Sequence, residues 1–200
     1  MRKLTVTAFV SVDGVMQGPG APEEDTDGDF RFGGWTVPHF DDEVGRFVSG
    51  TFERATGFVL GRRTYEIFAA YWPHHRGDPV ADGLNTLPKY VASRTLGSVG
   101  WEGAVLLEGD AADAVRELKE AGDGELQVHG SAGLVQSLHP LVDEYNLIVF
   151  PVVLGTGKRL FENGAAPGEL SLAGATTTGS VTINVYRREG DVPQGTFLDP

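Results

Sequence analysis

Short apolar runs alternate with stretches of helical periodicity along most of the chain. The first run, Leu4–Val12, is rich in β-branched residues and predicts a buried strand. Further runs predict strands at Gly57–Leu60, Lys89–Ser93, Ala104–Leu107 and Glu125–His129. Between them, apolar residues at helical spacing predict helices over Asp41–Arg54, from Gly61-Arg62 to about Tyr71, over Asp110–Ala121 and over Ser131–Leu138.

The pattern changes after the last of these helices. A long strand broken at Pro151 is predicted over Val142–Val153, and a closing hairpin follows at Leu170–Ala175 and Ser180–Arg187. Turn-forming residues predict long loops over Gly18–Gly34 and Trp72–Leu87. Strands that alternate with helices and then give way to consecutive strands predict an α/β fold, with a mostly parallel sheet, helices on both faces and an antiparallel C-terminal edge. We expect one domain over residues 1–188 and a Pro/Gly-rich tail over 189–200.

Composition and charge narrow the possible partners. A formal net charge of −12 argues against binding to nucleic acids or anionic membranes, which requires a broad basic surface. There is no cysteine, so disulfides and thiol chemistry are excluded. We find no signal peptide and no membrane-spanning run, and therefore expect a cytoplasmic protein.

No metal site is expected either. His74 and His75 have no partner at zinc-ligand spacing. The acidic run that begins at Asp25 fails as a calcium loop, because Phe30 stands where a glycine is needed and Thr36 where a glutamate is needed.

Three predicted strand ends carry groups suited to anions. They are Gly61–Thr64, with two arginines at a helix start, Ser93-Arg94, and the glycine turn His129–Gly133. Arginines at a helix N-terminus oppose the helix dipole, and a bound anion would remove that conflict. Because ligands of open α/β sheets bind at the carboxyl ends of the strands, these groups together favour a dinucleotide, and the arginines favour NADPH over NADH. Ser131 is expected to act as a helix cap, since the turn lacks the spacing of a G-x-S-x-G nucleophile.

Five motifs in order carry a resemblance to a known family. They are Phe9–Val15, Leu60–Glu66, Val91–Thr95, Val128–Ser131 and Phe150–Gly155. Over roughly residues 2–187 the chain resembles the dihydrofolate reductase superfamily, and within it proteins similar to the reductase (C-terminal) domain of the bifunctional riboflavin-biosynthesis deaminase-reductase, RibD. The resemblance implies a dihydrofolate reductase-like fold, an NADPH cofactor, a small-molecule substrate and a homodimer.

The resemblance also implies roles for individual residues. Arg62 and the pair Ser93-Arg94 would flank the 2′-phosphate of NADPH, and the loop after Gly14 would close over the nicotinamide. The two glycine turns would hold the pyrophosphate. The full set expected to bind the cofactor is Val15, Met16, Gly61, Arg62, Arg63, Thr64, Ser93, Arg94, His129, Gly130, Ser131, Ala132 and Leu134.

The substrate end departs from dihydrofolate reductases. Those enzymes carry an acid two residues after the proline of a Trp-x-x-Pro segment, whereas this chain has Phe40 there and acids only at Asp41 and Asp42. A shift of one residue turns a helical side chain by about 100°, which argues against folate reduction. The candidates for a catalytic proton donor are Asp41, Asp42 and Asp13, and those for substrate contacts are Trp35, Phe40, Phe150 and Lys158.

Two functions remain open at this point. The first is an NADPH-dependent reductase that transfers hydride to a small polar carbonyl or imine, such as a 5-amino-6-(5-phosphoribosylamino)uracil-like or pterin-like molecule. The second is a non-catalytic NADP(H)- or nucleotide-binding module.

Overall fold

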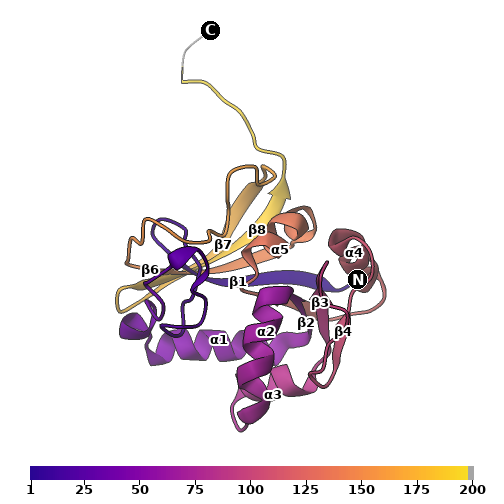
Figure 1. Ribbon diagram of the computed structural model, residues 1–200. Coiled ribbons are helices and arrows are strands. Elements are labelled where there is room, and N and C mark those ends of the chain that lie inside the picture. The colour runs from indigo at the N-terminus through magenta and orange to yellow at the C-terminus, as the bar shows by residue number, and fades with distance from the viewer. Residues whose placement is uncertain (198–200) are drawn as a thin grey trace.

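The computed structural model describes residues 1–197, and its centre is a single eight-stranded sheet (Figure 1). The strand order is β4-β3-β2-β5-β1-β6-β8-β7; β8 lies antiparallel to both β6 and β7, and every other neighbouring pair is parallel. This confirms the predicted mostly parallel sheet with an antiparallel C-terminal edge. The strands are β1 (Lys3–Ser11), β2 (Ala55–Gly61), β3 (Lys89–Ala92), β4 (Ala104–Leu106), β5 (Glu125–His129), β6 (Glu144–Phe150), β7 (Glu169–Thr178) and β8 (Val181–Gly190).

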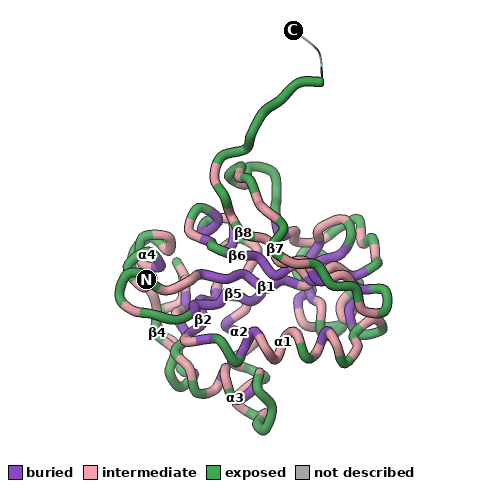
Figure 2. Tube along the Cα trace, turned by 180° about the vertical axis from the view of Figure 1, so that it is seen from behind, coloured by how far each residue is buried: buried purple, intermediate pink, exposed green. Residues whose placement is uncertain are grey.

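Helices cover both faces of this sheet (Figure 1). On one face, α4 and α5 pack on β1 through a cluster that joins Val115 and Val135 to Val6. On the other, α1 and α3 contribute Phe52 and Leu84 to a cluster built on Phe58 of β2. The helices are α1 (Asp42–Arg54), α2 (Arg62–Tyr71), α3 (Pro79–Thr86), α4 (Ala111–Glu120) and α5 (Ala132–Leu138). Burial is concentrated in the central strands, so the sheet is a rigid platform for its loops (Figure 2).

The segment predicted as a loop over residues 72–87 is partly helical, so that prediction was wrong. It contains a short 3-10 turn at Trp72–His74 and the helix α3. Asp78 caps α3 by accepting hydrogen bonds from the amides of Val80 and Ala81, and Pro79 occupies the first helical position. Proline and glycine in a short segment read as loop signals, whereas here the proline starts a helix.

Smaller differences concern the C-terminal strands. β6 ends at Phe150, so residues 151–153 do not continue it, and β7 is longer than the strand predicted at 170–175. β8 runs to Gly190, which brings the first residues of the predicted tail into the sheet. Residues 191–197 are exposed and lead away from the sheet (Figures 1 and 2), while residues 198–200 of the predicted tail lie outside the described part. No helix in residues 1–197 is long and apolar enough to cross a membrane.

Candidate active site

A cavity of about 610 Å³ opens at the carboxyl ends of β2 and β5. One part of its wall is backbone-rich and comes from the two glycine turns that follow these strands, over residues 61–64 and 130–134. The other part is apolar and comes from β1, α1, α2, α3 and their connections, with the side chains of Phe9, Phe40, Val48, Phe52, Phe68, Trp72 and Val80. The position agrees with the general rule that open α/β sheets bind ligands beyond their strand ends.

The two glycine turns touch each other. The hydroxyl of Ser131 accepts a hydrogen bond from the Gly61 amide at 2.9 Å and donates one to Thr64 Oγ1 at 2.8 Å. Gly130 has a φ of +65°, and a Cβ there would lie 3.2 Å from Thr64 Oγ1. The starts of α2 and α5 are therefore held side by side at one end of the cavity.

Ser131 occupies the position before α5 but does not cap it, so the sequence prediction was wrong on this point. Its φ is +62°, and its side chain makes no capping hydrogen bond. The hydroxyl is used instead between Gly61 and Thr64. Tertiary contacts from β2 and α2 thus replace the local interaction that the sequence favours.

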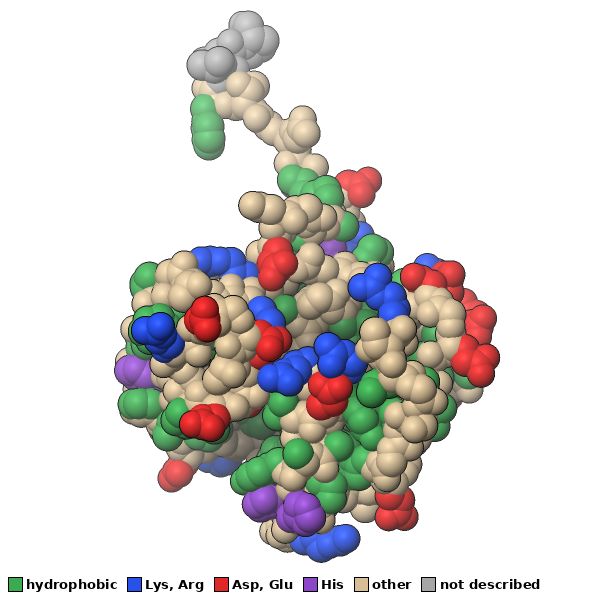
Figure 3. Space-filling view, in the orientation of Figure 1, with side chains coloured by type: hydrophobic (Ala, Val, Ile, Leu, Met, Phe, Trp, Pro, Cys, Tyr) green, Lys and Arg blue, Asp and Glu red, His purple; other side chains and the backbone are tan. Residues whose placement is uncertain are grey.

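The two arginines at the start of α2 both line the cavity and are both exposed. Arg62 pairs with Glu66 one turn later at 3.0 Å. Arg63 lies 3.8 Å from a carboxylate oxygen of Asp25 and 3.9 Å from one of Asp27. Figure 3 shows basic and acidic side chains next to one another near the middle of this face. Acids of the chain itself therefore relieve part of the conflict with the helix dipole, and both guanidinium groups keep further donors for an anion.

The predicted loop over residues 18–34 folds over the cavity and is held there by polar contacts of Lys158 and Gln17. Lys158 Nζ contacts Asp25 and Asp27, each at 2.7 Å. The Gln17 amide donates to the backbone carbonyls of the same two aspartates, at 3.1 and 2.9 Å. The hydrogen bond and charge of Lys158 lower the pKa of Asp27. Burial alone would lower the pKa of Lys158, but the hydrogen bonds and charges of Asp25 and Asp27 outweigh it, so that pKa is raised. Lys158 therefore holds the loop in place through its ion pairs with Asp25 and Asp27.

Replacing Lys158 by methionine is expected to loosen this loop. The variant keeps the aliphatic length and removes two charge-assisted hydrogen bonds, worth about 1–1.5 kcal/mol of local stability, which corresponds to roughly fivefold to tenfold faster opening. The rate of trypsin cleavage after Arg31, an exposed residue of the loop, measures this opening. Lys3→Met is the matched control, because Lys3 pairs with Glu144 at 2.8 Å on the first strand. Equal cleavage rates in the two variants would contradict a fastening role.

The third predicted strand end lies beside the cavity rim. Parallel pairing sets Ala92 of β3 against Gly61 of β2, which brings Ser93 and Arg94 to the same sheet edge as Arg62. Ser93 Oγ accepts hydrogen bonds from the amides of Thr95 and Leu96, and Arg94 is exposed. Neither residue lines the cavity.

The remaining predicted cofactor residues fall into two groups. Met16, His129, Ala132 and Leu134 line the cavity together with the glycine turns. Val15 is fully buried beneath the loop, in a cluster with Phe30, and does not line it.

The predicted substrate contacts divide in a similar way. Phe40 lines the cavity, is 44% exposed and meets Phe9 edge to face at 6.0 Å. Trp35 and Phe150 are buried and pack against each other at 5.6 Å. Their rings support the wall from behind, with Phe150 also against Phe9 at 5.6 Å.

The three predicted proton donors lie outside the cavity wall. Asp41 caps α1 through the amides of Glu43 and Val44, and its hydrogen bond from Thr178 and these amides lower its pKa. A hydrogen bond from Ser11, reinforced by the amides of Leu154 and Gly155, lowers the pKa of Asp13 to about 2.

Asp13 is also paired with Arg159, at 3.4 Å, and Asp42 is exposed in the first turn of α1. Both Asp13 and Asp41 therefore hold loops or helix ends as carboxylates, which makes them poor acids at neutral pH.

Several lining residues were missed by the sequence reasoning. Val48, Phe52 and Phe68 belong to apolar helix faces that periodicity assigns to the core, and nothing local distinguishes a cavity wall from a core. Glu24 is a further omission: it lines the cavity, and burial raises its pKa against two backbone hydrogen bonds. Its position in a long loop was the only available signal.

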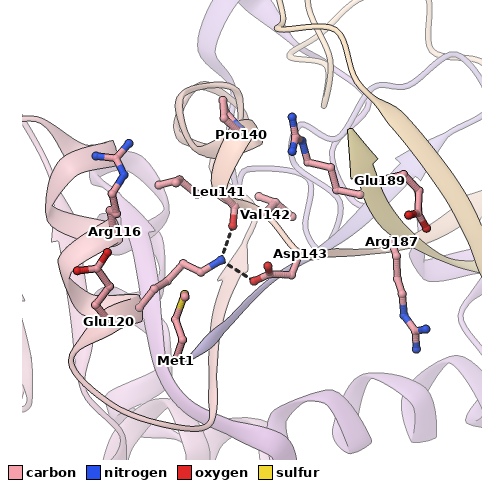
Figure 4. A pocket seen from close by; sticks show the side chains of 11 residues that line it. Met1, Arg116, Glu120, Pro140, Leu141, Val142, Asp143, Arg187 and Glu189 are labelled. Carbon is pink, nitrogen blue, oxygen red and sulfur yellow. Dashed lines mark hydrogen bonds and ion pairs between the residues drawn. The ribbon is translucent and has the colours of Figure 1, made fainter. Parts of the chain in front are cut away.

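A second cleft, of about 480 Å³, lies at the opposite ends of the parallel strands (Figure 4). Lys119 lines it, and its ammonium donates to the Leu141 carbonyl and to Asp143, each at 2.6 Å. Arg116 and Arg187 point away from Leu141 and Asp143 in Figure 4. The cleft lacks an aromatic wall and lies at the amino ends of β1 and β6, so we assign the site to the first cavity.

Several solved structures have the same fold. A Shewanella sp. PV-4 protein named for riboflavin biosynthesis is 22% identical, with a TM-score of 0.68 over 94% of this chain and 99% of that one. Dihydrofolate reductase from Enterococcus faecalis, complexed with NADP(H) and RAB-propyl, is 14% identical, with a TM-score of 0.61 over 93% and 96%. These likenesses show a dihydrofolate reductase-like fold.

Two further relatives extend the comparison. The Thermotoga maritima diaminohydroxyphosphoribosylaminopyrimidine deaminase/5-amino-6-(5-phosphoribosylamino)uracil reductase is 10% identical, with a TM-score of 0.61 over 94% of this chain and 56% of that one. The uncharacterized protein YyaP of Bacillus subtilis (strain 168) is 23% identical over 92% of this chain and 93% of its own length. The family model of the RibD C-terminal domain matches residues 2–183, so the chain belongs to the RibD C-terminal domain family.

Proposed function

We propose that this protein is an NADPH-dependent reductase that transfers hydride to a small polar substrate of the aminopyrimidine type. The observation that carries the proposal is the pair of glycine turns joined through Ser131 and Thr64, with Arg62 and Arg63 on one side and an apolar wall on the other. One part of the cavity suits an anionic cofactor and the other suits a flat ring. The NADP(H) complex of the E. faecalis enzyme and the name of the T. maritima reductase support the same cofactor and substrate class.

The residues at the turns fit a dinucleotide phosphate. The first amides of α2 lack partners within the helix and lie at the cavity, and a Cβ at Gly61 would already lie 3.2 Å from Ser131 Oγ. The absence of a Cβ at Gly61 therefore lets the two turns come together, and the residues that follow it line the cavity. Arg62 and Arg63 supply planar donors suited to phosphate oxygens, and a 2′-phosphate is the group that separates NADPH from NADH.

The chain's own residues would position the reaction. A reduced nicotinamide, when bound, supplies the hydride. Phe9 and Phe40 at the apolar wall would keep water away from the reacting face, and the loop fastened by Lys158 would close the cavity above it. Of the carboxyl groups lining the cavity, Glu24 has a raised pKa, so we place proton delivery there in preference to Asp13, Asp41 and Asp42.

Replacing Arg62 by alanine is expected to weaken NADPH binding selectively. Loss of a charge-assisted contact to the 2′-phosphate should raise the Kd for NADPH about 10- to 100-fold and the Kd for NADH less than about threefold. Fluorescence titration with both cofactors measures the ratio. Arg46→Ala is the matched control, because Arg46 also pairs within its helix, with Glu43 at 2.9 Å, and lies away from the cavity.

An unchanged NADPH preference in Arg62→Ala would remove this residue from the site. Turnover is tested separately, by NADPH oxidation with 5-amino-6-(5-phosphoribosylamino)uracil, pterins and simple ketones. If the protein binds the cofactor but none of these substrates oxidises NADPH, the proposal that it is a reductase is overturned.

A further inference from the structure

His129 places a polar ring in the apolar part of the cavity. It is the last residue of β5, is 8% exposed and lines the cavity. Its imidazole stacks on Phe52 of α1, with ring centroids 4.4 Å apart and planes 21° apart, and lies tilted against Phe58 at 5.9 Å. The ring is held rigidly, and a ligand that fills the cavity meets it.

A chain of hydrogen bonds along β5 fixes the tautomer of this ring. Glu125, Gln127 and His129 alternate along the strand and therefore share one face of the sheet. The Gln127 amide nitrogen donates to the Thr51 carbonyl at 2.6 Å and to Glu125 Oε1 at 2.7 Å. Both partners only accept, so Gln127 Oε1 is left to face His129 Nε2 at 3.0 Å. Nε2 carries the proton, and Nδ1 carries the lone pair.

Nδ1 has no hydrogen-bond partner within residues 1–197. The wall includes the apolar side chains of Phe9, Val48 and Phe52. Thr7, the cross-strand neighbour of His129 on β1, also lines the cavity; its hydroxyl accepts a hydrogen bond from Asn146 and, within the described residues, makes none with His129. Burial lowers the pKa of His129 to about 3, so the ring stays neutral and its lone pair stays available at physiological pH. A ligand that covers this nitrogen without donating to it leaves a buried acceptor unpaired, which weakens binding about 10- to 100-fold.

We propose that Nδ1 of His129 accepts a hydrogen bond from an N–H group of the bound ligand, and that it selects amino groups over methyl or carbonyl groups at that point. Two ligands of the proposed reaction carry such a group, an aminopyrimidine substrate and the carboxamide of the nicotinamide. The proposal rests on the proposed function only for the identity of these ligands. Gln127 is a positioning residue, since it acts through the tautomer of His129.

Two matched ligand pairs test the proposal in equilibrium titrations followed by tryptophan fluorescence, because Trp72 lines the cavity. One pair is 5,6-diaminouracil and 5,6-dimethyluracil, in which methyl groups replace amino groups of similar size. The other is NADPH and its reduced 3-acetylpyridine analogue, in which an acetyl group replaces the carboxamide. The wild type should prefer the amino member of one pair about 10-fold or more. The pair that shows the preference identifies which ligand contacts His129.

Three variants separate this role from a structural one. His129→Phe keeps the ring stack and should bind both members of that pair equally, while Gln127→Met frees the tautomer and should reduce the preference. His139→Phe removes another buried histidine, which does not line the cavity and whose Nδ1 is hydrogen-bonded to Tyr145 Oη at 2.5 Å. This variant should keep the full preference.

A wild type without preference in either pair, including one that binds neither uracil, overturns the proposal, and so does a preference that survives in His129→Phe. These are binding measurements, so they hold whether or not NADPH is oxidised. A reductase assay that fails while the preference is present rejects the proposed function alone.

Discussion

Gly130→Ala is expected to raise the Kd for NADPH at least about 10-fold and to lower the free energy of unfolding by about 1–2 kcal/mol. The backbone at Gly130 has a φ of +65°, where a Cβ carries a penalty of about 1–2 kcal/mol. The new Cβ would also lie 3.2 Å from Thr64 Oγ1. Because the Thr64 hydroxyl is hydrogen-bonded to Ser131, the alanine is expected to push apart the two turns at which we propose that the cofactor phosphates bind.

The matched control for this variant is Gly109→Ala. Gly109 has a φ of +72° and open space where its Cβ would lie, so it carries the same backbone penalty without a steric contact. Urea denaturation and NADPH titration of both variants separate the two effects. We expect both variants to lose a similar amount of stability, and only Gly130→Ala to show a raised Kd for NADPH. Equal NADPH binding by the two variants would place the cofactor elsewhere.

The two glycine turns at one end of the cavity were predictable because their signals are local. Gly61, Arg62 and Arg63 follow a buried strand within a few residues, and Gly130 and Ser131 follow another. Periodicity identifies the two strands, and because they are parallel, the turns that follow them lie at the same edge of the sheet. The role of Ser131 was not predicted, because its partners, Gly61 and Thr64, are about seventy residues away in sequence.

The apolar end was not predictable in the same way. Hydrophobic spacing marks Phe52 and Phe150 alike as inward-facing, yet Phe52 lines the cavity and Phe150 is fully buried behind Phe9. Which inward side chain borders empty space depends on how α1, α2 and α3 pack together. Asp41 shows a related ambiguity, because an acid at a helix start suits both capping and catalysis, and here it caps.

Charged residues presented a third kind of difficulty. Lys158 was predicted to contact substrate, which stays a prediction since it lines the cavity, and Asp25 was considered only as a failed calcium ligand. The fold joins them across 133 positions of sequence. Long-range ion pairs leave no periodic signal in the sequence, so the attachment of the loop to Lys158, in the segment after β6, became visible only in three dimensions.

His129 is expected to make the protein sensitive to acid. Burial lowers its pKa from 6.5 to about 3 in the folded state, so between these values the unfolded chain binds a proton that the folded chain does not. Stability is therefore unaffected by this group above about pH 6.5 and falls as the pH drops below it, by about 1.4 kcal/mol per unit. From pH 7.5 to pH 4.5 the loss through His129 alone is about 3 kcal/mol.

Urea denaturation of the wild type and His129→Phe at pH 7.5 and 4.5 measures this effect. Phenylalanine keeps the stack on Phe52 and cannot be protonated, so the stability of the variant relative to the wild type should improve by about 3 kcal/mol on acidification. Burial also lowers the pKa of His139, but both proteins retain that residue and its contribution cancels. A difference between the two proteins that does not change with pH would mean that His129 is protonated in the fold, and its Nδ1 would then be unable to accept a hydrogen bond.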